Sequence, residues 1–212
     1  MSKFEKQWKT QETEGFGKRT RDAVRGPQPL KPQIQKATQQ LTGEINRLDQ
    51  ASNRLKQRES SIFKKTVTAV QAHDQESSKA YSNELAEVRK MQKIVTQSRI
   101  ALEQITTRLQ TVTDVGDFAA TIAPAIGVIK NIRSTLGEAM PDAQGALGEI
   151  GAQLNSIMVD VGTITGTSFY QAENSDEANK ILSEAAAIAE KRMGDSLPEV
   201  PNTSSESVFT NE

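Results

Sequence analysis

The sequence predicts an all-α protein in which a long antiparallel helical hairpin is followed by two or three shorter helices. Apolar residues recur every seven positions in two long runs, and no proline interrupts residues 33–123. Hydrophobic and aromatic residues make up only 35% and 4% of the 212 residues. A seven-residue repeat keeps one side of a helix facing its partner along its whole length, and the low apolar content disfavours a thick globular core.

The two apolar runs mirror each other about Gln75. They consist of Ile34, Leu41, Leu48, Leu55, Ile62 and Ala69, and then Tyr81, Val88, Val95, Leu102 and Leu109. Partner residues have numbers that sum to 150, which is the register of an antiparallel hairpin. We expect this hairpin over residues 30–113, with arms of about 60 Å. Its predicted core contains Leu41, Leu48, Leu55, Ile62, Val88, Val95, Leu102 and Leu109.

The remaining segments follow from turn residues and helical periodicity. Residues 1–29 are polar, basic and interrupted by Gly and Pro, which predicts an N-terminal arm. Asp74 is the expected N-cap of the second hairpin helix. A joint at residues 114–117 separates the hairpin from helices three and four within residues 115–167, and these helices complete a core unit over residues 30–167. Residues 168–212 supply a linker, a short fifth helix over residues 175–193 and a flexible tail.

Charge is divided unevenly along the chain. Residues 1–70 carry 15 Lys and Arg against 7 Asp and Glu, whereas residues 71–212 carry 11 against 20, although the whole chain has a net charge of −1. This asymmetry predicts a basic half for an anionic surface and an acidic half that pairs with basic segments of neighbouring copies or of its own chain. The alternative is a set of solvated helix faces with uneven charge.

The residue types that enzymes and metal sites need are scarce. The chain has no Cys and one His, His73, at the predicted hairpin turn, and its carboxylates do not cluster at ligand spacing. Gly145, Gly148 and Gly151 fit close helix packing or a bendable element better than a nucleotide fingerprint. We therefore expect no enzymatic activity, no cofactor and no metal. A pI of about 6.0 and few aromatic residues after Phe16 disfavour nucleic acid as the anionic partner.

The N-terminal arm carries the candidate membrane anchor. Phe4 and Trp8 lie four residues apart among lysines, so both rings share one face if the segment becomes helical. The alternatives are a disordered leader or a Trp8 that packs into a neighbouring subunit. The charged start is not a signal peptide, and no apolar stretch is long enough to span a bilayer, so we expect a soluble or peripheral protein. The residues expected to contact an anionic membrane are Phe4, Trp8, Lys18, Arg19, Arg21, Arg25, Lys31 and Lys36.

The tail contains one well-defined short motif, Leu-Pro-Glu-Val-Pro at residues 197–201. Its prolines favour an extended conformation, and Leu197 and Val200 offer two apolar anchors for a groove between helices. The alternative is a proline-stopped end of the fifth helix, which is compatible with the first role.

The order of these segments resembles ESCRT-III, and within it the archaeal division proteins of the CdvB type. The order is a basic first helix with an acidic remainder, a long hairpin, two shorter helices and a small helix that leads into a Leu-Pro-x-Val-Pro tail. The resemblance covers about residues 28–201 and includes residues 100–112, 124–133 and 140–142. Larger CdvB proteins carry a C-terminal winged-helix domain. Because about eleven residues follow Pro201, we expect a short form without that domain.

This resemblance implies a subunit that polymerises with itself and with paralogous ESCRT-III subunits into membrane-bound filaments, which constrict or sever the membrane in archaeal cytokinesis. It also implies disassembly by an AAA ATPase of the CdvC type, whose MIT domain would bind Leu197, Pro198, Val200 and Pro201. The implied location is cytoplasmic, on the inner face of the cell membrane at the division site. Two alternatives stay open: a membrane-stress scaffold related to PspA, and a soluble coiled-coil adaptor without membrane activity.

Overall fold

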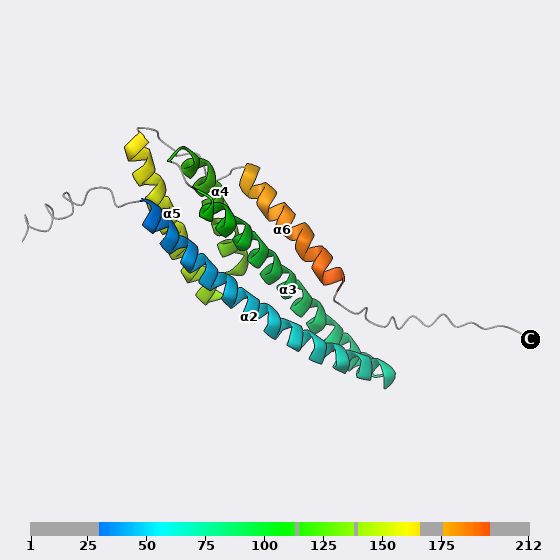
Figure 1. The fold of residues 1–212 in the computed structure, drawn as a ribbon. Coiled ribbons are helices and arrows are strands. Elements are labelled where there is room, and N and C mark those ends of the chain that lie inside the picture. The colour runs from blue at the N-terminus through cyan, green and yellow to red at the C-terminus, as the bar shows by residue number, and fades with distance from the viewer. Residues whose placement is uncertain (1–29, 113–114, 138–139, 166–175, 196–212) are drawn as a thin grey trace, which may run out of the picture.

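The chain forms five α-helices and no strand in the residues that the computed structural model describes, which are 30–112, 115–137, 140–165 and 176–195. The helices are α2 (Leu30–Gln71), α3 (Gln75–Gln110), α4 (Val115–Leu136), α5 (Pro141–Thr165) and α6 (Asp176–Gly194), as labelled in Figure 1. The predicted all-α fold class is confirmed. The predicted arm and tail lie outside the described residues.

Helices α2 and α3 form the predicted antiparallel hairpin. They contain 42 and 36 residues, which corresponds to about 63 and 54 Å. Asp74 caps α3, since its carboxylate accepts a hydrogen bond from the backbone N–H of Ser77 at 3.0 Å. His73 lies in the turn with a φ of 55°, a left-handed conformation that His adopts more readily than most residues. Its side chain is exposed, which fits a turn residue.

Ion pairs across the hairpin report its register. Glu59 pairs with Arg89 at 2.8 Å, and Asp49 lies 3.8 Å from Arg99. The residue numbers total 148 in these two pairs, close to the value of 150 that the apolar spacing predicts, and 142 in a third pair across the hairpin, Arg58 with Glu84. The mirrored sequence pattern therefore corresponds to the observed alignment of α2 with α3.

The hairpin interior contains most of the side chains expected there. Leu55 is half-buried, whereas the following seven residues are buried: Leu41, Leu48, Ile62, Val88, Val95, Leu102 and Leu109. These residues belong to two clusters. A large cluster joins the base of the hairpin, where α2 begins and α3 ends, to α4, α5 and α6. A small one, near the turn, contains Ile62, Leu85 and Val88, and Leu55 packs against both.

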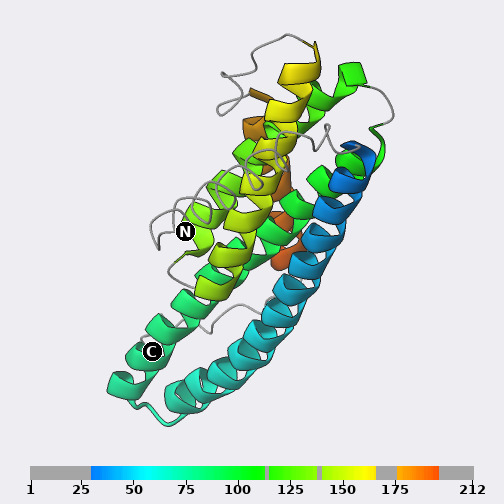
Figure 2. The same cartoon turned by 90° about the vertical axis from the view of Figure 1, so that its left-hand side faces the viewer.

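Helices α4 and α5 form a second antiparallel pair against the base half of the hairpin, where α5 contacts α2 and α4 contacts α3. Figure 2 shows that the half nearest the turn extends beyond them as two helices. Two glycines of α5 lie next to side chains of α4. A Cβ on Gly148 would lie 3.2 Å from the guanidinium carbon of Arg133, and one on Gly151 would lie 3.5 Å from Ile129. The contact at Gly148 is tight but involves the end of a flexible side chain, and the one at Gly151 is an ordinary van der Waals distance, so packing against α4 does not require glycine at Gly151.

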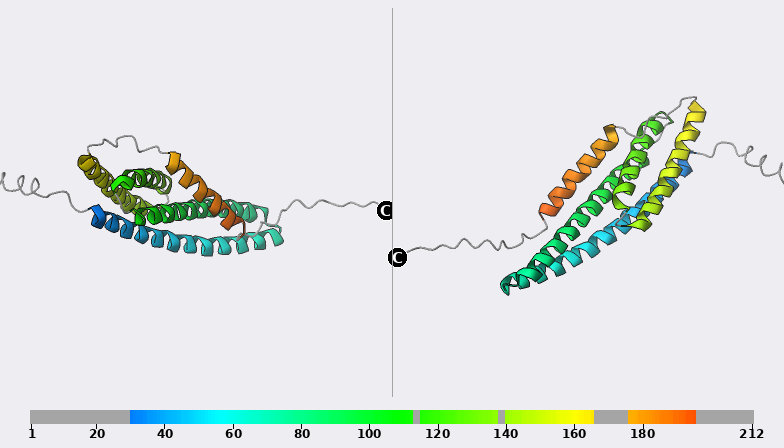
Figure 3. Two further views of the ribbon diagram at one scale, coloured as in Figure 1. Left: turned by 45° about the horizontal axis from the view of Figure 1, so that its top comes forward. Right: turned by 180° about the vertical axis from the view of Figure 1, so that it is seen from behind.

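Helix α6 lies along α3 and also contacts α4, as the two views of Figure 3 show. Four small or branched side chains on one side of α6 are buried: Ala178, Ile181, Ala185 and Ala189. Acidic residues occupy its first turn, and Lys191 and Arg192 occupy its last, which is the charge order that a helix dipole favours.

We expect Leu48→Asp to lower the free energy of unfolding by about 3 to 5 kcal/mol, because Leu48 is fully buried and an unpaired carboxylate would lie in the large cluster. Circular dichroism during thermal and urea unfolding measures this loss. Gln50→Asp, on the exposed side of the same helix, is the control and should change stability by less than about 0.5 kcal/mol. Equal stability of the two variants would contradict the inferred hairpin packing.

Candidate functional site

The predicted membrane-contact residues fall into two groups. Lys31 and Lys36 lie in the first two turns of α2, and both side chains are exposed. The other six lie outside the described residues, and so do the four residues of the predicted ATPase-binding motif: Phe4, Trp8, Lys18, Arg19, Arg21 and Arg25, and then Leu197, Pro198, Val200 and Pro201. The described structure therefore brings together only the α2 part of the expected basic surface.

The ratio of basic to acidic residues is much higher on the exposed surface of α2 than in the helix as a whole. The helix contains three acidic residues, and the fold buries two of them, with Glu44 at 4% and Glu59 at 5% exposure. Asp49 is the one acidic residue of α2 with an exposed side chain, whereas all eight basic residues are exposed: Lys31, Lys36, Arg47, Arg54, Lys56, Arg58, Lys64 and Lys65. We call these eight residues the α2 basic surface. It extends over nearly the whole helix.

The two buried acidic residues of α2, Glu44 and Glu59, lie in polar layers of the hairpin interior. Between the apolar layers, α2 contributes the buried residues Glu44, Ser52, Glu59 and Thr66, and α3 contributes the buried residues Gln92, Ser98 and Thr106. By a total of 150, Glu44 lies level with Thr106 and Ser52 with Ser98, and Glu59 lies one residue from the level of Gln92. The hairpin thus alternates apolar and polar layers, and Glu44 and Glu59 are interior rather than surface residues.

The two buried carboxylates differ in how well they are paired. Glu59 accepts two hydrogen bonds from the guanidinium of Arg89, at 2.8 and 3.1 Å. Glu44 accepts one from Arg47 at 2.6 Å, but its second oxygen is buried without a hydrogen-bond partner, as is the hydroxyl of Thr106. Burial raises the pKa of Glu44, and the charge of Arg47 only partly opposes this effect. Keeping the Glu44 carboxylate ionised in this layer therefore lowers the stability of the fold.

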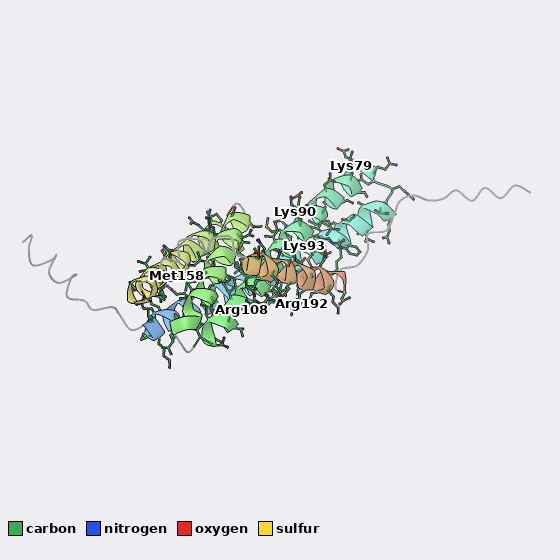
Figure 4. All side chains as sticks on the ribbon, turned by 90° about the horizontal axis from the view of Figure 1, so that it is seen from above. Lys79, Lys90, Lys93, Arg108, Met158 and Arg192 are labelled. Atoms are coloured by element: carbon green, nitrogen blue, oxygen red, sulfur yellow. The ribbon has the colours of Figure 1, made fainter. Side chains whose placement is uncertain are left out.

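Ion pairs at both ends of α6 hold it against α3. Arg108 pairs with Glu177, and Lys93 pairs with Glu190, while the Gln97 side chain contacts the Leu182 carbonyl at 3.5 Å. Figure 4 shows α6 lying along α3 beside Lys93 and Arg108. Hydrogen bonds from Arg108 and Lys93 lower the pKa of Glu177 and of Glu190. This stabilisation is present above the ordinary pKa of Glu and is lost as pH falls through the lowered values, although exposure keeps it small.

The described residues have no group of three or more His, Asp or Glu side chains suited to hold a metal ion. Among the helices in these ranges, none combines the length and the apolarity that crossing a bilayer requires. The described surface has two notable features. One is the α2 basic surface, and the other is α6, which packs on α3 and forms two ion pairs with it.

Comparisons with known proteins find two relatives that are named as cell division proteins. The chain is 38% identical to Cell division protein B1 of Sulfolobus acidocaldarius over 173 residues, which cover 82% of this chain and 81% of that protein. It is 27% identical to Cell division protein B of the same organism over 177 residues, which cover 84% and 68%. No family model and no solved structure matches the chain.

We expect Glu44→Gln to raise the free energy of unfolding at pH 7 by an amount on the order of 1 kcal/mol. Because burial raises the pKa of Glu44, its charged form costs stability at neutral pH. That cost falls as pH drops through the raised pKa and disappears below the ordinary value of about 4.3. The gain should therefore be larger at pH 7 than at pH 4 in urea unfolding.

Glu87→Gln, on the exposed side of α3, is the matched control for this substitution and should show no such pH-dependent gain. A Glu44→Gln variant that is less stable than the parent chain at pH 7 would show that the carboxylate stabilises the hairpin, contrary to the role inferred from its burial.

Proposed function

Because this chain belongs to the family of the archaeal cell division protein B, we propose that it is a structural subunit of cell division that assembles on anionic membrane. In this proposal many copies, with or without paralogous subunits, form filaments that constrict or sever the membrane. The subunit acts by assembly rather than by catalysis. The inner face of the cell membrane at the division site is the proposed location.

The α2 basic surface is the observation that supports membrane binding. Each basic side chain near an anionic lipid surface contributes about 1 kcal/mol, and the effect fades within a Debye length of about 8 to 10 Å. A side chain at the far end of a long helix contributes only if the helix lies along the surface. A single subunit therefore binds weakly, whereas a filament of many subunits binds strongly through avidity.

We propose that the N-terminal arm, residues 1–29, adds to this adhesion. Lys18, Arg19, Arg21 and Arg25 extend the positive charge ahead of Lys31 and Lys36. Phe4 and Trp8 supply apolar contacts of the kind that favour the membrane interface. In this division of roles, residues 30–167 form the assembling core and the arm attaches it to lipid.

Residues 168–212 are proposed to serve disassembly. The prolines of the motif at residues 197–201 favour an extended conformation, and its two apolar side chains suit the MIT domain of an AAA ATPase. A five-residue motif makes few contacts, so we expect micromolar or weaker affinity, about 8 kcal/mol or less. Weak single contacts suit a release cycle, because many motifs on one filament recruit an oligomeric ATPase through avidity.

The experiment that tests this function is flotation with vesicles of phosphatidylglycerol and phosphatidylcholine. We expect Arg54→Glu with Lys64→Glu to weaken binding at least about tenfold, because two favourable charges become two unfavourable ones. Reversal of Lys18, Arg19, Arg21 and Arg25 to Glu should do the same, and binding should weaken as salt rises.

Lys180→Glu with Lys191→Glu makes the same change in net charge on the exposed side of α6 and is the matched control. Its binding should fall far less than that of the α2 variant. Equal flotation of the parent chain with neutral and anionic vesicles would contradict the electrostatic basis of the proposal. No flotation with either kind of vesicle would favour a soluble coiled-coil adaptor.

A further inference from the structure

A groove opens at the base of the hairpin, between the first turns of α2 and the last turn of α3. Its volume is about 550 Å³, within the range of about 300 to 1,000 Å³ typical of ligand-binding clefts. Eight residues line it: Lys31, Ile34, Gln35, Thr38, Gln39, Leu109, Gln110 and Val112. Ile34, Leu109 and Val112 provide an apolar floor, three glutamines provide amide groups at the rim, and Lys31 provides a positive charge.

This chemistry suits an extended, acidic peptide with two apolar side chains. Apolar side chains would fill the floor, and glutamine amides can donate to and accept from an extended backbone, whose polar groups need partners when buried. Lys31 would pair with an acidic side chain. From the lining of the groove and the sequence of the tail, we infer that the groove binds the Leu-Pro-Glu-Val-Pro segment, residues 197–201, of a second copy of this chain.

Charge favours the tail over the other terminal segment as the occupant. Residues 196–212 contain three Glu and no Lys or Arg, whereas residues 1–29 contain seven Lys and Arg against four Asp and Glu. Lys31 attracts the former and repels the latter. The motif also suits the apolar floor, since Leu197 and Val200 lie three residues apart and prolines favour an extended conformation.

The direction of α6 shows that the bound tail belongs to another copy. Glu177 pairs with Arg108 and Glu190 with Lys93, so α6 runs away from the base of the hairpin. Asp195, one helical turn beyond Lys191, is therefore on the order of 30 Å from the level of Leu109. The six residues from Asp195 to Pro201 span at most about 21 Å. A chain cannot place the motif in its own groove.

This contact would link copies of the proposed assembly, and to that extent it rests on the proposed function. The motif would then have a second binding partner besides the ATPase. A tail that is bound to a neighbouring subunit is not available to the ATPase. Since the groove exists in a single chain, peptide binding can be measured without any filament or membrane.

The test uses a fluorescein-labelled peptide of residues 195–212 and the full chain, followed by fluorescence anisotropy. We expect saturable binding that is lost when the peptide carries Leu197→Asp with Val200→Asp. Lys31→Glu in the full chain should weaken binding about threefold to tenfold. Lys79→Glu, which is exposed at the turn end of the hairpin and does not line the groove, is the matched control and should leave binding unchanged.

Disulfide trapping locates the peptide, because the chain contains no cysteine. A peptide with Val200→Cys should cross-link to the full chain with Gln35→Cys, and not to the full chain with Gln57→Cys, an exposed position outside the groove. Absence of saturable binding, equal cross-linking at both positions, or stronger binding of a peptide of residues 1–29 would overturn the inference. Vesicle binding by the parent chain would still support the proposed function in each of these cases.

Discussion

The packing of α2 against α3 is the interaction on which the rest of the structure depends. Its apolar layers hold two helices of 42 and 36 residues together. Its polar layers contain Glu44 and Glu59, which are therefore buried. This arrangement has two consequences. The base half of the hairpin packs its apolar side chains against α4, α5 and α6, and the exposed charged residues of α2 are all basic except Asp49.

The sequence was sufficient for the hairpin, because a seven-residue apolar repeat leaves few other ways to bury Leu41, Leu48, Leu102 and Leu109 together. It was not sufficient for the polar layers. Glu44 and Glu59 have the residue type of a solvated surface, and their burial depends on how the partner helix meets the positions between the leucines. A signal was present, since each lies three residues from an apolar layer position, Leu41 or Ile62. The predicted arm and tail residues stay predictions.

The proposed function relies on contacts that are weak singly. In that proposal the α2 basic surface contributes modest adhesion per subunit, and the short tail motif binds its partner weakly. An array of copies makes such contacts effective together. Helix α3 ends at Gln110 and α4 begins at Val115, so residues 115–117 of the predicted joint belong to α4.

Electron microscopy of the full chain with vesicles tests the central claim, assembly on anionic membrane, most directly. The chain should form filaments on vesicles that contain phosphatidylglycerol at low salt, and these filaments should be sparse or absent on neutral vesicles of phosphatidylcholine. Filaments that form equally on both, or no ordered assembly on anionic vesicles at any protein concentration that saturates them, would contradict it.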